Sequence, residues 1–202
     1  MIYLIGGAPR CGKTIFSKAI AKKKRISWIS TDSIWSVVVA STPKNQIAKK
    51  FPYRRTRLGV HSAKSISAAE IAESKTLWPG IRAFIERIIE IHEDYVIEGV
   101  HLMPELIRTL KRKKYWKDIS VVYLVKEDLQ KIKDGFSRNV AAHDWLAAMF
   151  KKSPHLKEAA AEMVREKSRH IAVGADRYGL KVVNMDDAFE KKMAGLVKEL
   201  SS

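Results

Sequence analysis

The segment Gly7–Thr14, with the sequence GAPRCGKT, combines residue types at a spacing that suggests phosphate chemistry. It fits the pattern G-x-x-x-x-G-K-[ST], whose glycines let successive backbone N–H groups turn toward phosphate oxygens. A helix beginning at Lys13 would point its positive end at the same phosphates. We expect Lys13 to reach the β- and γ-phosphates of a nucleoside triphosphate and the Thr14 hydroxyl to bind Mg²⁺. The predicted nucleotide-binding residues are Gly7, Ala8, Pro9, Arg10, Cys11, Gly12, Lys13, Thr14 and Ile15.

Two carboxylates stand where strands of the predicted sheet end. Asp32 follows the strand at 26–30, and Glu98 closes the strand at 95–101. Ligands of open parallel sheets gather at these carboxyl ends. A carboxylate there can accept the proton of an acceptor hydroxyl or hold a Mg²⁺-bound water. We expect Asp32 to be the base or the group that orients the acceptor, although it also suits a helix N-cap. Thr14, Asp32 and Glu98 are the candidate Mg²⁺ ligands, and which carboxylate serves the metal stays open.

Cationic side chains are needed around a phosphoryl group in transfer, because negative charge spreads over its oxygens. The segment 126–150 follows the fourth strand, where small P-loop kinases carry a lid, and we expect Arg138 to be its catalytic cation with Lys131 and Lys133 in support. A second group is Arg54, Arg55 and Arg57. Guanidinium groups bind phosphate or carboxylate through two hydrogen bonds, so these arginines predict an anionic acceptor. Asp32, Glu98 and His101 complete the predicted acceptor-binding set.

The elements that must position these side chains alternate between short apolar runs and longer amphipathic segments. This alternation predicts an α/β fold with a parallel sheet and helices on both faces, and the loop motif makes it a three-layer sandwich of the P-loop NTPase type. We expect one domain over 1–202, a five-stranded parallel sheet in the order 2-3-1-4-5, and a substrate-binding insertion over about 33–92. The predicted strands are 2–5, 26–30, 95–101, 119–125 and 180–185. The predicted helices include 13–24, 102–113, 127–150, 155–173 and 186–200.

The region between the second and third strands is harder to interpret. Residues 33–40 suit a short helix or an extended apolar piece, and 41–65 contain Pro43, Pro52 and Gly59 and are expected to be irregular. Ser67 and Glu70 have the spacing of a capping box, in which Glu70 would reach back to the backbone at the start of a helix. That helix is expected to end or kink near Pro79, and a second helix to run to about His92.

The amino-acid composition of the chain limits the classes of protein to which it can belong. The chain has 202 residues, 46% of them hydrophobic, which suffices for a packed core and argues against disorder. The formal net charge of +16 suits phosphorylated ligands or nucleic acid, and also a plain solvated basic surface. Cys11 is the single cysteine, so an internal disulfide is excluded and a reducing cytoplasm is expected. We expect no secretion signal and no membrane-spanning segment.

The chain resembles the small P-loop kinases, and within them the 2-phosphoglycerate-kinase-like group. The matching pieces are the P-loop at Gly7–Thr14, the segment STDSI at 30–34, the segment EGVHL at 98–102 with Pro104 beyond it, and LWPGI at 77–81. The resemblance implies a core sheet of the nucleoside-monophosphate-kinase type. It also implies ATP and Mg²⁺ as co-substrates and phosphoryl transfer to a small acceptor, anionic like 2-phosphoglycerate.

Other functions stay open from the sequence. Zeta-toxin-like and antibiotic-phosphorylating kinases share the same layout and need only a different acceptor pocket. A kinase of nucleic-acid ends, or a nucleic-acid-stimulated ATPase, would suit the basic charge, but no RNA-binding motif accompanies it and nucleic acid is not favoured as a partner. A GTPase-like switch is disfavoured because Val125 precedes Lys126 and Asp128, where guanine recognition requires a polar residue. The acceptor and the oligomeric state are not predicted.

Overall fold

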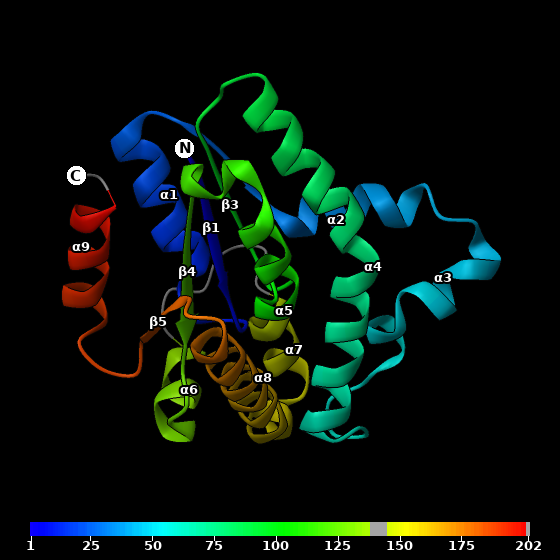
Figure 1. Ribbon diagram of the computed structural model, residues 1–202. Coiled ribbons are helices and arrows are strands. Elements are labelled where there is room, and N and C mark those ends of the chain that lie inside the picture. The colour runs from blue at the N-terminus through cyan, green and yellow to red at the C-terminus, as the bar shows by residue number, and fades with distance from the viewer. Residues whose placement is uncertain (138–144, 201–202) are drawn as a thin grey trace.

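A parallel β-sheet forms the centre of the computed structural model, which describes residues 1–137 and 145–200. Within that part of the chain the sheet has five strands in the order β2-β3-β1-β4-β5, and every pairing is parallel (Figure 1). This confirms the predicted fold class and strand order. The strands are β1 (Ile2–Gly7), β2 (Ser27–Ser30), β3 (Tyr95–Gly99), β4 (Ile119–Val125) and β5 (Lys181–Asn184).

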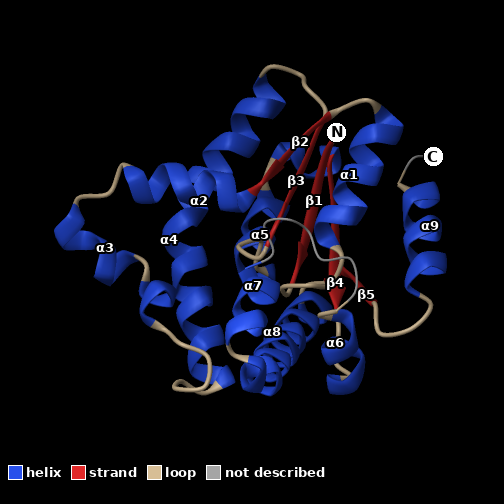
Figure 2. Cartoon of the chain, turned by 180° about the vertical axis from the view of Figure 1, so that it is seen from behind, coloured by secondary structure: helices blue, strands red, loops and turns tan. Residues whose placement is uncertain are grey.

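Helices connect the strands and cover both faces of the sheet, as Figures 1 and 2 show from opposite sides. The α-helices are α1 (Lys13–Lys24), α2 (Thr31–Ala40), α3 (Lys44–Lys50), α4 (Ala63–Glu90), α5 (Pro104–Ile107), α6 (Leu129–Gly135), α7 (Trp145–Lys152), α8 (Lys157–Arg177) and α9 (Phe189–Glu199). Short 3₁₀ turns occupy Pro52–Arg55, Arg108–Arg112, Lys114–Asp118 and Pro154–Leu156.

Two apolar clusters hold these layers together, one on each face of the sheet. Successive side chains of a strand point to opposite faces. Tyr3 and Ile5 of β1 therefore join one cluster, which includes residues of α1 and α9, while Ile2 and Leu4 join the other, which includes residues of α4. Helix α8 contributes to both clusters. The central strand is buried on both sides, so its carboxyl end is held rigidly below the loop that follows it.

Helix α4 differs from its prediction at both ends. It begins at Ala63, and the Ser62 hydroxyl caps it by accepting a hydrogen bond from the Ser65 backbone N–H at 3.1 Å. The predicted capping box of Ser67 and Glu70 is wrong, because both side chains lie buried inside the helix. The helix also continues through Pro79 to Glu90, although a helix end was one of the two outcomes expected there.

Other segments between strands also differ from expectation. Residues 41–65 are not wholly irregular, since they include α3 and a 3₁₀ turn. The predicted helix at 102–113 consists of the four-residue α5 followed by a 3₁₀ turn, and the described part of 127–150 contains two separate helices, α6 and α7. Residues 33–40 adopt the helical alternative, within α2. Over the described ranges, no helix combines the length and apolar character that crossing a membrane requires.

Candidate active site

The loop between β1 and α1 has the backbone shape that its glycines were predicted to allow. Gly7 has a φ of 148°, and a Cβ there would lie 2.2 Å from the Leu124 carbonyl oxygen. Gly12 has a φ of 94° and stands at the N-cap of α1. Since both backbone conformations are rarely adopted by residues with a side chain, glycine is required for the turn and for its close approach to β4.

The N-terminus of α1 presents its backbone donors without a side-chain cap. Gly12 cannot supply one, and no acidic residue lies in the first turn of the helix. The first N–H groups of a helix have no partner inside it, and the helix dipole adds partial positive charge at the same place. This end of α1 therefore forms an anion-binding cradle, which suits phosphate.

Lys13 adds a full positive charge to this cradle. Its side chain is mostly buried, with 7% of the residue exposed, and its Nζ donates a hydrogen bond to the Ala8 carbonyl at 2.8 Å. The ammonium group is thus held beside the loop backbone.

Cys11, in the same loop, is fully buried, and burial raises the pKa of its thiol. A buried thiol with a raised pKa behaves as a packing residue.

Glu98, at the end of β3, lies beside Thr14 in the first turn of α1. The Thr14 hydroxyl donates a hydrogen bond to Glu98 Oε1 at 3.1 Å. Glu98 is 3% exposed, and burial raises the pKa of its carboxyl, while the nearby Lys13 opposes this shift. A hydroxyl and a carboxylate held together next to a phosphate cradle provide the oxygen ligands that Mg²⁺ prefers.

Asp32 lies in the first turn of α2 with its carboxylate directed at the cavity. Ser30 is the N-cap of α2, and its hydroxyl accepts a hydrogen bond from the Asp32 backbone N–H at 3.2 Å, so Asp32 does not fill the capping role. Water reaches the carboxylate through the cavity mouth, and 74% of its side chain is accessible. The surrounding walls still displace much of its hydration, and this burial raises the pKa of Asp32, against the effect of Lys13.

His101 is held behind Asp32 by the close approach of two segments. Its Nδ1 lies 2.9 Å from the Thr31 hydroxyl oxygen and 3.8 Å from Asp32 Oδ1. Gly99 allows this packing, because a Cβ there would lie 1.7 Å from Thr31 Oγ1. Burial, with Lys167 and Lys13 nearby, lowers the pKa of His101 to about 3. The imidazole is therefore neutral near pH 7 and orients its neighbours without adding charge.

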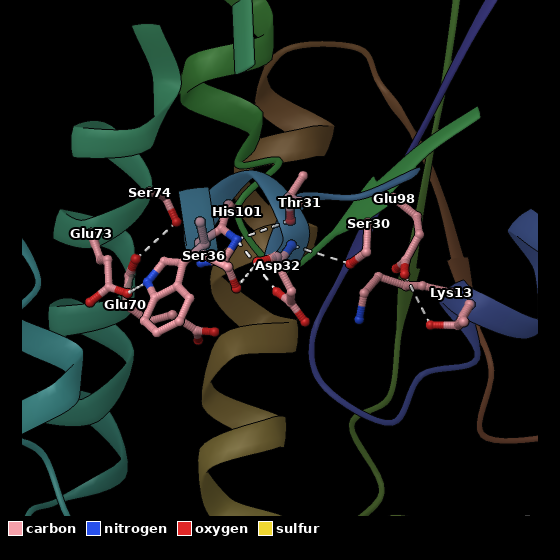
Figure 3. A network of polar contacts seen from close by, with 12 residues as sticks. Lys13, Ser30, Thr31, Asp32, Ser36, Glu70, Glu73, Ser74, Glu98 and His101 are labelled. Carbon is pink, nitrogen blue, oxygen red and sulfur yellow. Dashed lines mark hydrogen bonds and ion pairs between the residues drawn. The ribbon is translucent and has the colours of Figure 1, made fainter. Parts of the chain in front are cut away.

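These groups surround one cavity of about 590 Å³, which extends from the phosphate cradle to α4. Figure 3 shows Lys13 and Glu98 at one side of this region, Asp32 near its centre, and Glu70 and Glu73 on α4 at the other. The volume falls in the usual range for small-molecule sites. The lining residues are Pro9, Arg10, Lys13, Thr14, Asp32, Trp35, Ser36, Tyr53, Glu70, Glu73, Glu98, Gly99, Val100, His101 and Leu146.

Eight lining residues were not predicted as site residues, and four of them, Trp35, Tyr53, Glu70 and Glu73, are joined by contacts between α4 and its neighbours. Glu73 accepts hydrogen bonds from the Trp35 indole N–H and from the Tyr53 backbone N–H, the latter at 3.2 Å. Glu70, one turn earlier on α4, is paired with Lys167 of α8 at 2.6 Å, and both side chains are buried. A carboxylate pair at i and i+3 inside an apolar helical pattern was the available signal, because such buried charges require partners.

The predicted arginines lie elsewhere. Arg54 and Arg57 line an adjoining cavity of about 550 Å³, which shares Trp35 and Tyr53 with the first, and Arg55 lines neither cavity. Arg54 stacks over the Trp35 ring, 5.4 Å from its centre. Arg138 lies outside the described residues. Lys131 and Lys133, its predicted supporters, pair with Asp187 at 2.5 Å and Glu158 at 2.9 Å.

Comparison with known proteins gives the fold a context. No protein-family model and no curated protein matches the chain. A sugar kinase from Janibacter sp. HTCC2649 is similar with a TM-score of 0.53 and 14% identity, over 98% of this chain and 93% of that chain. A protein from Chloroflexus aurantiacus j-10-fl, provisionally named a kinase, is similar with a TM-score of 0.52 and 14% identity, over 98% of this chain and 92% of that chain. At this level of identity the likeness concerns the fold alone, which is that of the P-loop proteins.

Proposed function

We propose that this protein is an ATP- and Mg²⁺-dependent kinase that phosphorylates a hydroxyl group of a small molecule. One observation carries the proposal. The cavity of about 590 Å³ joins a phosphate cradle containing Lys13 to a carboxylate, Asp32, that has no capping role to explain it. The sugar-kinase name of one structural neighbour agrees with this reaction class.

The cradle binds the triphosphate in this proposal. Backbone N–H groups of the loop and of the α1 N-terminus donate to the phosphate oxygens, and Lys13 neutralises charge on the β- and γ-phosphates. Lys13 leaves the Ala8 carbonyl, its hydrogen-bond partner at 2.8 Å, to reach the phosphates. The lysine thus stays inside the cradle in both positions.

The transfer step balances with Asp32 as the base. The acceptor hydroxyl oxygen forms a bond to the γ-phosphorus while the bond between that phosphorus and the β,γ-bridging oxygen breaks. ADP leaves with the electron pair of that bond, and the hydroxyl proton passes to the Asp32 carboxylate. A raised pKa makes Asp32 a stronger base than an ordinary aspartate, and His101 and Thr31 fix its surroundings.

Thr14 and Glu98 are the residues that would hold Mg²⁺, directly or through water. The ion would supply positive charge that offsets the charge of the phosphate groups. The pairing of Thr14 with Glu98 at 3.1 Å keeps both oxygens on the cradle side of the cavity. We assign the metal role to Glu98 and the base role to Asp32, because Glu98 is 3% exposed and Asp32 is open to an acceptor.

Calorimetry and turnover test this function together. MgATP should bind to the wild-type chain, and ADP release should rise when the right acceptor is added from a panel of sugars, aminosugars, nucleosides, 2-phosphoglycerate, aminoglycosides and 5′-hydroxyl RNA. Asp32→Asn should abolish the stimulation while leaving MgATP affinity within a few-fold of wild type. Absence of binding to ATP, ADP and their guanine counterparts would disprove the proposal, and stimulation by RNA alone would point to a nucleic-acid-end kinase.

A further inference from the structure

The cavity carries opposite charges at its two ends. The cationic lining residues among those that the structure describes are Arg10 and Lys13, and both belong to the phosphate cradle. The far end is lined by Asp32, Glu70 and Glu73. An acceptor bound at this end therefore contacts carboxylates and not the cationic side chains of the cradle.

Only one of these three carboxylates is balanced by a cation at close range in the described chain. Lys167 pairs with Glu70 at 2.6 Å, and neither side chain is more than 5% exposed. Glu73 instead accepts from two neutral N–H groups, those of the Trp35 indole and the Tyr53 backbone. The imidazole beside Asp32 is neutral, as its pKa of about 3 requires. Lys13 acts on Asp32 and Arg54 acts on Glu73 electrostatically, but within the described chain neither forms an ion pair with that carboxylate, so both carboxylates keep oxygens for a cationic ligand.

Aromatic side chains line the same end. Trp35 and Tyr53 belong to the wall, and Glu73 is bonded to both residues. Aromatic faces attract cations, and partial desolvation strengthens the attraction. Carboxylates next to aromatic rings favour an ammonium group and disfavour a second anion, which would lose hydration without gaining a partner.

We propose, resting on the kinase function above, that the phosphoryl acceptor is a hydroxylated molecule bearing a primary ammonium group, of about the size of an aminosugar. Its ammonium group binds Glu73 between the rings of Trp35 and Tyr53, while its reacting hydroxyl faces Asp32. This class differs from the anionic acceptor that the arginine cluster predicts from sequence, since Arg54 and Arg57 line the adjoining cavity.

Three hexoses that differ in charge test the proposal. Glucosamine, glucose and glucuronate are titrated, each into the full-length protein with Mg²⁺ and a non-hydrolysable ATP analogue, and dissociation constants are measured by ligand-observed NMR. We expect glucosamine to bind most tightly and glucuronate most weakly, with about a fivefold or larger difference between the two, as one solvent-accessible charge contact gives. Any other order, or no measurable binding of any of the three, overturns the proposal.

A pair of matched variants tests whether Glu73 causes the preference for glucosamine over glucuronate. Glu73→Gln removes the charge and keeps one of the two acceptor oxygens that Trp35 and Tyr53 use, so the preference for glucosamine over glucuronate should shrink to about twofold or less. Glu90→Gln makes the same change at an exposed site of α4 and should leave the ratio unaltered. Should Glu73→Gln fail to fold, Asp32→Asn is expected to weaken the same preference. A preference that survives both changes contradicts the assignment.

The nucleotide titration separates this proposal from the kinase function. If the ATP analogue fails to bind while glucosamine is still preferred, the kinase function is wrong and the charge preference stands. If the analogue binds and glucuronate is preferred, the kinase function stands and the acceptor class is wrong.

Discussion

The two ends of the cavity are built in different ways. At the end that we propose to bind nucleotide, one continuous segment from Gly7 to Thr14 supplies the amides, the lysine and the hydroxyl to which we assign Mg²⁺ binding. At the acceptor end, the wall is assembled from α2, the 3₁₀ turn at Pro52–Arg55, α4 and the segment after β3. The first end depends on local backbone geometry, and the second depends on long-range packing.

This difference shows where each end is vulnerable. A change in the cradle should damage chemistry while the fold persists, since the strand beneath it is buried and paired on both sides. A change among the residues that join α4 to α8 should damage the fold first. Four variants, described from the largest expected effect to the smallest, examine this contrast.

Lys167→Met should have the largest effect, on stability. It leaves the Glu70 carboxylate buried without its partner, and breaking such a pair costs about 3–5 kcal/mol. The free energy of unfolding from urea titration, at pH 7, measures the loss. Lys157→Met, at an exposed site of the same helix, is the control and should change stability by about 0.5 kcal/mol or less. Equal effects of the two variants would show that the buried pair does not hold α4 against α8.

Lys13→Ala should reduce the rate of ADP formation by about 10²–10³-fold, because one charge facing the transferring phosphoryl group is lost. Stability should change much less than in Lys167→Met, and ATP affinity should fall more than ADP affinity, since Lys13 is assigned to the terminal phosphates. Steady-state rates and calorimetry supply these values, with Lys23→Ala as an exposed control on the same helix. A full rate in Lys13→Ala would contradict the assignment of the cradle.

His101→Gln should change how stability depends on pH. The pKa of His101 is about 3 in the folded chain and ordinarily 6.5, so below pH 6.5 the unfolded chain binds a proton that the folded chain does not. This contribution is complete above pH 6.5 and is lost as pH falls, by about 1.4 kcal/mol per pH unit.

The measurement is the difference between wild type and His101→Gln in urea titrations at pH 7.5, 6 and 5. The carboxyls of Asp32, Glu73 and Glu98, whose pKa values are raised by burial, act in the opposite direction in both proteins, so the difference isolates the histidine. Wild type should lose its advantage as pH falls, while exposed His155→Gln shows no such trend. A constant difference would mean that the pKa of His101 is the same in the folded and the unfolded chain.

Arg54→Ala should have the smallest effect. It removes a contact between an exposed guanidinium and the Trp35 ring, which is worth about 0.5–1 kcal/mol of stability. Arg55→Ala, next to it, should change stability by less than about 0.5 kcal/mol. Neither should weaken glucosamine binding if the acceptor end is as we propose. A tenfold loss of acceptor binding in Arg54→Ala would instead show that the arginine cluster binds the acceptor.

The sequence predicted the fold and the backbone shape of the Gly7–Thr14 loop because both depend on patterns within short stretches. Alternating apolar runs are sufficient to predict a parallel sheet, and the loop motif carries its own spacing. The acceptor end lacks such a pattern. Glu70 was interpreted as the second member of a capping box, whereas its partner is Lys167, on a helix far along the chain.

Trp35 and Tyr53 illustrate the same limit. Trp35 lies in the segment 33–40, expected to be a short helix or an extended apolar piece, and Tyr53 lies in a region expected to be irregular. Their role in the wall depends on the position of Glu73, which bonds both residues from α4. The pairing of residues across three elements has no local sequence signal, because it is set by tertiary packing. The roles assigned to Asp32, Glu98 and the arginines stay predictions.

Pro79 has a mechanical consequence for α4. A proline has no N–H, so the carbonyl of Lys75 lacks its usual partner within the helix, and α4 is least stiff at that point. Beyond it, Ile81 and Ile85 are fully buried against the sheet, while the stretch before it bears Glu70 and Glu73. The helix is therefore held on both sides of this turn, by the sheet after Pro79 and by the pair of Glu70 with Lys167 before it. Any bending of α4 would be concentrated at this turn, and it would change the angle between the stretch that carries Glu70 and Glu73 and the stretch packed on the sheet.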